Sequence, residues 1–154
     1  MLVLARPYQV ATEYLLIRTD FAPQFIDLTD RVRNIVAESG IESGQAVVFS
    51  QHTTAAIRIT EAEPELLQDF VTFLATVAPV NAVYRHDDFT TRTVNMTPDE
   101  QANGHAHCRH LLMATSETVP IARGRLCLGD WQRIFLVELD RPRQRSVIVQ
   151  VVGQ

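Results

Sequence analysis

The hydrophobic pattern of the first forty residues predicts one strand followed by one helix. Residues 8–19 alternate loosely between apolar and polar side chains and are rich in residue types that suit a pleated surface. Apolar side chains then recur at helical spacing, at Leu28, Val32, Ile35 and Val36. Asp27 or Thr29 is the expected N-cap and Gly40 the stop signal. We therefore expect a β-strand and then an amphipathic helix.

The next forty residues predict two short strands and a second helix. An apolar run over residues 46–50 and an alternating run over residues 56–60 indicate strands on either side of His52. Residues 63–79 then place apolar side chains on one face of a helix, with Pro64 suited to its first turn.

The rest of the chain predicts a loop, a short helix and an antiparallel meander. Residues 80–104 are polar and lack periodicity, which is typical of a functional or a mobile loop. We expect a third helix over about residues 105–115 and three strands joined by turns between residues 119 and 153. Helices mixed with consecutive strands favour an α+β fold over a doubly wound parallel sheet.

Length and composition fit a single domain over residues 1–154, with 46% hydrophobic and 21% charged residues. No stretch approaches the ~20 apolar residues of a membrane span. Arg6 and Pro7 interrupt the apolar N-terminal stretch and no cleavage site follows, so we expect no targeting segment and a cytoplasmic location. Cys108 and Cys127 have no CxxC spacing, and free buried thiols are favoured over a disulfide between them.

The net charge and the type of basic residue limit which ligands the protein can bind. A net charge of −4 argues against nucleic acid, which is bound chiefly by basic surfaces. All 14 basic residues are arginines. Any anion site must therefore use arginine, histidine, backbone amides or a metal ion.

Histidine is the leading candidate for chemistry, and three of the five histidines lie within six positions at His105, His107 and His110. Residues two apart share a face only in a strand, whereas residues three apart share one only in a helix. All three therefore cannot readily bind one ion, and a polar surface cluster is the alternative.

Two further histidines stand in stretches that suggest a site. His52 lies at a predicted strand end beside Thr53 and Thr54, and His86 lies beside Asp87. One histidine from each of three segments would form a three-ligand site with open positions, as in catalytic zinc centres. Otherwise His52 caps a turn and His86 is simply exposed.

Charged side chains supply the other candidates. Arg141, Arg143 and Arg145 alternate along the chain, so their guanidinium groups could lie on one side and grip a phosphate. An edge strand made soluble by charge is the alternative. Glu61, at a strand-to-helix junction, is a candidate base or ligand.

The ordered segments HTTAAIRITEAEP, YRHDD, NGHAH and VPIARGRLCLGDWQRIFLVELDRPRQR closely resemble the YjbQ-like family, described as secondary thiamine-phosphate synthase enzymes. The resemblance runs from about residue 8 to the C-terminus. It implies a small α+β protein with an antiparallel β-sandwich that assembles as a homotrimer. It also implies a divalent metal ion, Zn²⁺ or Mg²⁺, bound by His52, His86 and His107, with His105 and His110 dispensable.

The same motifs imply substrate-binding residues, which are Thr53, Thr54, Asn103, Trp131 and Gln132. The reaction implied is the joining of a pyrimidine-methyl pyrophosphate to a thiazole phosphate with loss of pyrophosphate. In it, Arg143 and Arg145 would stabilise the leaving pyrophosphate and Glu61 a developing cation.

Two alternatives stay open. One is a metal-dependent hydrolase of a phosphorylated or cyclic metabolite, with Glu61 or Asp87 as the base. The other is a non-catalytic trimer that binds an anion or a metabolite. In any of these, residues 87–102 are a candidate lid.

Overall fold

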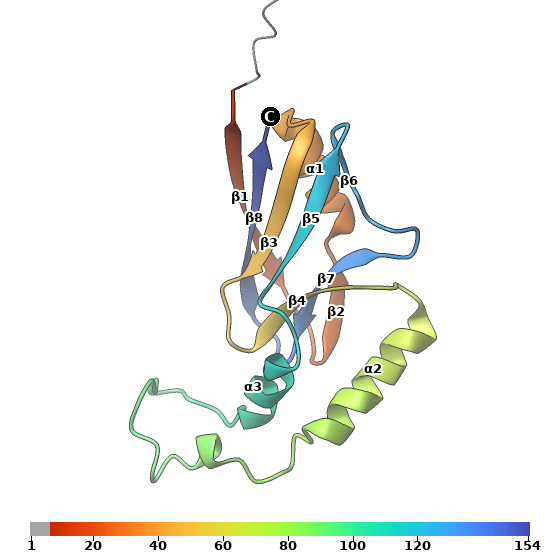
Figure 1. Ribbon diagram of the computed structural model, residues 1–154. Coiled ribbons are helices and arrows are strands. Elements are labelled where there is room, and N and C mark those ends of the chain that lie inside the picture. Colours follow the sequence, from red (N-terminus) through yellow and green to blue (C-terminus); the bar gives the residue numbers. More distant parts are fainter. Residues whose placement is uncertain (1–6) are drawn as a thin grey trace, which may run out of the picture.

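Within residues 7–154, which the computed structural model describes, the chain forms two antiparallel β-sheets and three α-helices. The larger sheet has five strands in the order β1-β8-β3-β5-β6, and the smaller has three in the order β2-β7-β4 (Figure 1). The elements are, in chain order, β1 (Gln9–Arg18), β2 (Gln24–Asp27), α1 (Thr29–Ser39), β3 (Ser43–Ser50), β4 (Ala55–Thr60), α2 (Pro64–Val77), the 3-10 helix η1 (Arg85–Asp87), α3 (Gly104–Leu111), β5 (Ser116–Ala122), β6 (Arg125–Leu126), β7 (Arg133–Glu138) and β8 (Gln144–Gly153).

The main hydrophobic core lies between the two sheets. Val147, Val149 and Val151 alternate along β8, are fully buried, and belong to the same apolar cluster as Ile134 and Leu136 of β7. Successive side chains of a strand point to opposite faces, so this alternation directs one face of β8 into the core and the other outward.

Helix α1 closes one side of this core through contacts with β6, β7 and β8. Its buried face includes Val32 and Val36. At its start the carboxylate of Asp27 accepts a hydrogen bond from the backbone N–H of Thr29 at 2.8 Å. It ends at Gly40, whose left-handed backbone (φ 67°) is the conformation that favours glycine after a helix.

A second apolar cluster covers the outer face of the three-stranded sheet. Phe135 and Val137 of β7 pack there with Leu74 of α2 and Ala106 of α3. Strand β7 is therefore covered on both faces, which explains why it lacks a polar alternation.

The predicted α+β fold with an antiparallel β-sandwich and three helices is confirmed. The helix predicted to stop at Gly40 is confirmed as α1, which begins at Thr29, but strand β2, whose residues 24–27 pair with β7, was not predicted. The third helix is shorter than predicted and ends at Leu111. Three residues later the carbonyl of Ala114 accepts the N–H of Ile57, so the chain has already turned toward β4.

Three smaller expectations can now be compared with the structure. None of the helices within residues 7–154 is long and apolar enough to cross a membrane. The expectation of no targeting segment falls largely on residues 1–6, outside the described residues. Cys108 and Cys127 are free as predicted, but both are exposed, so the prediction of buried thiols is wrong. On α3 the buried positions belong to other residues, including Ala106 and Arg109.

The fold brings several connections together at one end of the sandwich, opposite the C-terminus. The turn between β3 and β4, the beginning of β8 and helix α3 all lie at this end, together with the long segment that joins α2 to α3 (Figure 1). This end holds the candidate site.

Candidate functional site

A cavity of about 410 Å³ opens at this end of the sandwich. Its lining comes from four parts of the chain: the β3–β4 turn, the segment that runs from η1 to the start of α3, helix α3 itself and the start of β8. The lining residues are Gln51, His52, Thr53, Thr54, His86, Arg92, Asn95, Glu100, Asn103, His107, Arg143 and Arg145. Eight of these are site residues predicted from the sequence.

Two of the three predicted metal ligands lie against each other. The rings of His86, on η1, and His107, on α3, have centroids 4.5 Å apart and meet edge to face at 65°. Burial lowers the pKa of His107, and the neighbouring charge of His86 lowers it further, so His107 is held in its neutral form. The Nε2 atom of His86 and the Oδ1 atom of Asn103 are buried without a hydrogen-bond partner among the described residues.

The pairing of these rings depends on how η1 docks against α3. The Oδ1 atom of Asp87 accepts hydrogen bonds from the backbone N–H groups of Asn103 and Gly104, at 2.9 and 2.8 Å. A Cβ atom on Gly104 would lie 2.5 Å from Cβ of Tyr84, so only glycine permits this approach. Asp87 does not line the cavity, and its contacts support a positioning role.

Replacing Asp87 with alanine is therefore expected to lower the free energy of unfolding by about 1–2 kcal/mol, because two helix N-terminal amides lose their acceptor. Urea unfolding would measure this loss. Asp88→Ala is the matched control, since Asp88 is exposed and its carboxylate accepts hydrogen bonds from Thr90 and Thr91 of its own turn instead of from α3. Equal stabilities of Asp87→Ala and Asp88→Ala would contradict the positioning role.

His52 also lines the cavity, but unlike His86 and His107 it is hydrogen-bonded through its ring to the backbone of the described chain. Its Nε2 atom accepts a hydrogen bond from the backbone N–H of Ser146, at 2.8 Å. Burial, followed by the positive charges of Arg145 and Arg143 against an opposing effect of Glu138, lowers the pKa of His52. His52 is therefore a neutral imidazole with one nitrogen already engaged by the backbone.

Arg145 forms a buried ion pair beneath the cavity. Its Nε donates to Oε2 of Glu138 at 2.6 Å, its Nη2 donates to Oε1 of the same carboxylate, and Nη2 also donates to Oγ1 of Thr54 at 3.1 Å. Glu138 accepts further hydrogen bonds from the backbone N–H groups of Leu139 and Asp140 and from Thr19. The charge of Arg145 is therefore largely neutralised.

Arg143 is the more available guanidinium of the cavity. Its Nη2 donates to Oδ2 of Asp140 at 2.6 Å, and its side chain stays 33% exposed. Arg141 shares the same carboxylate at 3.1 Å with similar exposure but does not line the cavity. Two of the three predicted arginines, Arg143 and Arg145, are thus brought to the site.

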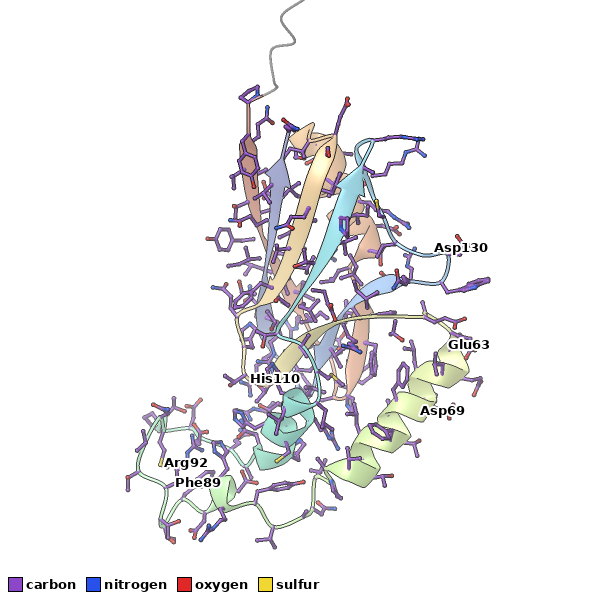
Figure 2. All side chains as sticks on the ribbon, viewed as in Figure 1. Glu63, Asp69, Phe89, Arg92, His110 and Asp130 are labelled. Atoms are coloured by element: carbon purple, nitrogen blue, oxygen red, sulfur yellow. The ribbon has the colours of Figure 1, made fainter. Side chains whose placement is uncertain are left out.

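The segment predicted as a lid, residues 87–102, contributes Arg92, Asn95 and Glu100 to the cavity lining. The Arg92 guanidinium donates to the backbone carbonyls of His86, Val94 and Asn95 and to the Glu100 carboxylate. Arg92 therefore holds this segment in one folded shape beside the His86–His107 pair. Figure 2 shows Arg92 on this segment, apart from Asp130 and Glu63.

Three predicted site residues lie elsewhere. Glu61 and Trp131 border a separate hollow of about 450 Å³, and Gln132 turns back to accept a hydrogen bond from the N–H of Gly129. Thr54 and Glu61 flank the two ends of β4, so they are roughly 20 Å apart at about 3.3 Å per residue. In Figure 2, Glu63 and Asp130 lie along the right-hand side of the molecule, apart from His110.

Sequence reasoning missed several residues of the site. Arg92, Asn95 and Glu100 stand in a stretch without periodicity, and nothing local marked them. Glu138 and Asp140, which pair with the arginines, do carry a signal. An acidic residue that continues the buried face of a strand needs a partner of opposite charge.

The fit of a metal ion to these residues is partial. No group of three His, Cys, Asp or Glu side chains within the described chain is close enough to hold one. His86 and Asn103 offer buried atoms that lack a partner, and His107 lies beside them, so this set suits an ion completed by substrate oxygens. His52 does not suit it, because Nε2 already accepts a hydrogen bond. His110, although its Nε2 is also unpartnered, lies outside the cavity lining.

Fold and site together define a class: a small α+β sandwich with a cavity lined by histidine and arginine at one end. The chain belongs to the UPF0047 family of YjbQ-like proteins, whose family model matches residues 13–154. A UPF0047 protein of Methanothermobacter thermautotrophicus is 38% identical over 146 residues, 95% of this chain and 94% of the relative. One of Synechocystis is 36% identical over 157 residues, 100% and 99% of the two chains.

Solved structures give the same result. A YbjQ-like protein of unknown function from Sulfolobus solfataricus superposes with a TM-score of 0.84 at 31% identity, covering 96% of this chain and 100% of the other. A protein of the same family from Clostridium acetobutylicum superposes with a TM-score of 0.79 at 38% identity, covering 90% and 98%.

Proposed function

We propose that this chain is an enzyme that acts on a phosphorylated small molecule in the His–Arg cavity, with secondary thiamine-phosphate synthase activity as the specific reaction. The observation that carries the proposal is the convergence, in one hollow of about 410 Å³, of the His86–His107 pair with Arg143 and Arg145. Guanidinium groups match phosphate oxygens in geometry and charge.

The proposed reaction sets clear demands on these residues. The C–O bond between the pyrimidine methylene and pyrophosphate breaks, pyrophosphate leaves with the electron pair, and the thiazole nitrogen forms the new C–N bond. Arg143 would stabilise the negative charge that builds on the leaving group, while Arg145, paired with Glu138, would hold the base of the cavity in place. A divalent ion, with Zn²⁺ favoured by imidazole ligands, would add positive charge near His86 and His107.

The carboxylate assigned to stabilise the developing cation is not Glu61 in this proposal, because Glu61 borders the other hollow. The carboxylate that lines the cavity is Glu100, which Arg92 holds through a 3.1 Å ion pair. The backbone hydrogen bond from Thr97, together with the hydrogen bond and charge of Arg92, lowers the pKa of Glu100 against an opposing effect of burial, so it stays ionised. Hydrolysis of phosphoesters is less well supported, since no unpaired carboxylate base among the described residues lines the cavity.

The direct test offers the purified protein both thiamine precursors, with Zn²⁺ or Mg²⁺ or with a chelator, and measures thiamine phosphate by chromatography. We expect product from the wild-type protein and a loss of about a hundredfold or more in His107→Ala. Cys127→Ser, a change at an exposed thiol, is the control and should retain activity. Absence of thiamine phosphate would refute the synthase assignment, and hydrolysis of phosphoesters or tight pyrophosphate binding without turnover would support the hydrolase or the non-catalytic alternative.

The homotrimer implied by the family resemblance also stays a prediction. Exposed apolar side chains on β1 and β3, among them Val10, Tyr14, Leu16 and Phe49, are the surface that such an assembly would cover. A trimer would also account for the long unpaired edge of β1, which pairs only with β8 in the single chain.

A further inference from the structure

We infer that His52 is a hydrogen-bond donor to a bound oxyanion, through Nδ1–H, and is not a metal ligand. The inference uses the proposed cavity but not the proposed reaction. It assigns to His52 a different chemistry from that of His86 and His107, although all three imidazoles line the same hollow.

The His52 ring carries a single proton, and its contact with Ser146 determines which nitrogen holds it. The backbone N–H of Ser146 can only donate, so Nε2 of His52 must accept with its lone pair. A neutral imidazole carries one proton, which therefore resides on Nδ1. A metal ion needs a lone pair on nitrogen, and in this arrangement neither nitrogen of His52 has one to give.

The His52 ring is held firmly in this orientation by the contacts of Ser146. Ser146 is joined to the β3–β4 turn by three hydrogen bonds. Besides the bond to His52, its carbonyl accepts from the N–H of Gln51 at 3.3 Å and its hydroxyl donates to Oε1 of Gln51 at 2.8 Å. Turning the His52 ring toward a metal would leave the Ser146 N–H without its partner, and an unpaired backbone donor is costly.

The Nδ1–H group of His52 is left without a partner in the described part of the protein. This atom is not one of the buried atoms left unpaired, so it is accessible to a ligand on a residue that lines the cavity. Arg143 and Arg145 border the same cavity, and both interact electrostatically with His52. Thr54 accepts from Arg145 through Oγ1, which leaves the Thr54 hydroxyl hydrogen free to donate. Donors and positive charge at one place define an oxyanion site.

Two substitutions separate the two nitrogens of His52. The amide of glutamine reaches the position of Nε2, so His52→Gln retains an acceptor for Ser146 and loses the donor. The shorter amide of asparagine lies near Nδ1, so His52→Asn retains a donor to the cavity and loses the acceptor. The pair therefore tests the cavity contact and the structural contact independently.

The experiment begins with long-range ¹⁵N–¹H NMR of the histidine rings of the full chain, with and without Zn²⁺. We expect a protonated Nδ1 and an unprotonated Nε2 for His52, unchanged by Zn²⁺. Calorimetry with pyrophosphate should show affinity about tenfold lower in His52→Gln, the worth of one hydrogen bond to a charged group, and a smaller loss in His52→Asn.

Other results would overturn the inference. They are a His52 ring protonated on Nε2, ring signals of His52 that shift with Zn²⁺ as those of His107 do, or unchanged pyrophosphate affinity in His52→Gln. None of these measurements requires turnover. A protein that makes no thiamine phosphate but shows the expected tautomer and affinities would refute the proposed synthase reaction and leave the role of His52 intact.

Discussion

Replacing Glu138 with alanine is expected to lower the free energy of unfolding by about 3–5 kcal/mol. The side chains of Glu138 and Arg145 are 0% and 2% exposed, so the substitution leaves a guanidinium charge buried without a counterion. It also removes the acceptor for two backbone N–H groups and for Thr19. Urea unfolding at neutral pH, followed by circular dichroism, would measure the loss.

Two controls distinguish this effect from a general sensitivity to lost charges. Arg33→Ala removes an ion pair to Asp30 whose side chains are 50% and 74% exposed, and it should cost no more than about 0.5 kcal/mol. The double substitution Glu138→Leu with Arg145→Met removes both charges and should recover much of the loss, since the cost lies mainly in the unpaired ion. A loss below about 1 kcal/mol in Glu138→Ala would show that Arg145 finds another partner or water.

The Glu138–Arg145 pair also determines how the free energy of unfolding changes with pH. Burial alone would raise the pKa of Glu138, but hydrogen bonds from Arg145, Asp140 and Thr19, with the charge of Arg145, bring it below its usual 4.5. A carboxyl with a lowered folded-state pKa stabilises the fold above its unfolded value, and this stabilisation is lost as the pH falls through the folded-state pKa. The stability difference between wild type and Glu138→Gln should therefore shrink below about pH 4.5.

The elements of the fold could be predicted because each rests on a local pattern. Apolar spacing and the stop at Gly40 were sufficient for α1, and Pro64 for the start of α2. A local sequence pattern does not show which strands pair with each other. Strand β2 was not predicted, because only its register with β7, Gln24 opposite Glu138, makes it a strand.

The site could be predicted in part for a related reason. His52, His86 and Arg143 stand at the ends of elements, and ends of antiparallel strands meet at the same edge. Glu61 was predicted as a candidate base because it is a carboxylate at a strand-to-helix junction. The extended backbone of β4 carries it to the opposite end of the sheet.

The partners of the arginines show how far residue types alone can mislead. Arg145 was predicted to bind a substrate phosphate, yet its main partner is Glu138. Glu138 lies on the same buried face of β7 as Ile134 and Leu136. A carboxylate at such a position is stable only when paired, so the sequence contained evidence that one of the arginines is structural. The pairing also identifies which arginine is left to contact an anion.

Replacing Arg143 with alanine is accordingly expected to weaken pyrophosphate binding by about 10- to 100-fold, the worth of a charge-assisted hydrogen bond or two. One of its guanidinium nitrogens is bound to Asp140, and the side chain is one-third exposed where it lines the cavity. Isothermal calorimetry at fixed ionic strength would measure the affinity, since exposed charges are screened by salt.

The chain offers matched controls for this prediction. Arg141 shares Asp140 with Arg143 and is almost equally exposed, but it does not line the cavity, so Arg141→Ala should retain affinity within about threefold, as expected for a screened distant charge. Arg143 also borders a neighbouring hollow of about 480 Å³ that contains Arg18. A loss in Arg18→Ala as large as in Arg143→Ala would place the anion in that neighbouring hollow, and equal losses in Arg141→Ala and Arg143→Ala would reduce the effect to net charge. Among these three arginine variants, a loss confined to Arg143→Ala assigns the anion to the cavity that His52, His86 and His107 share.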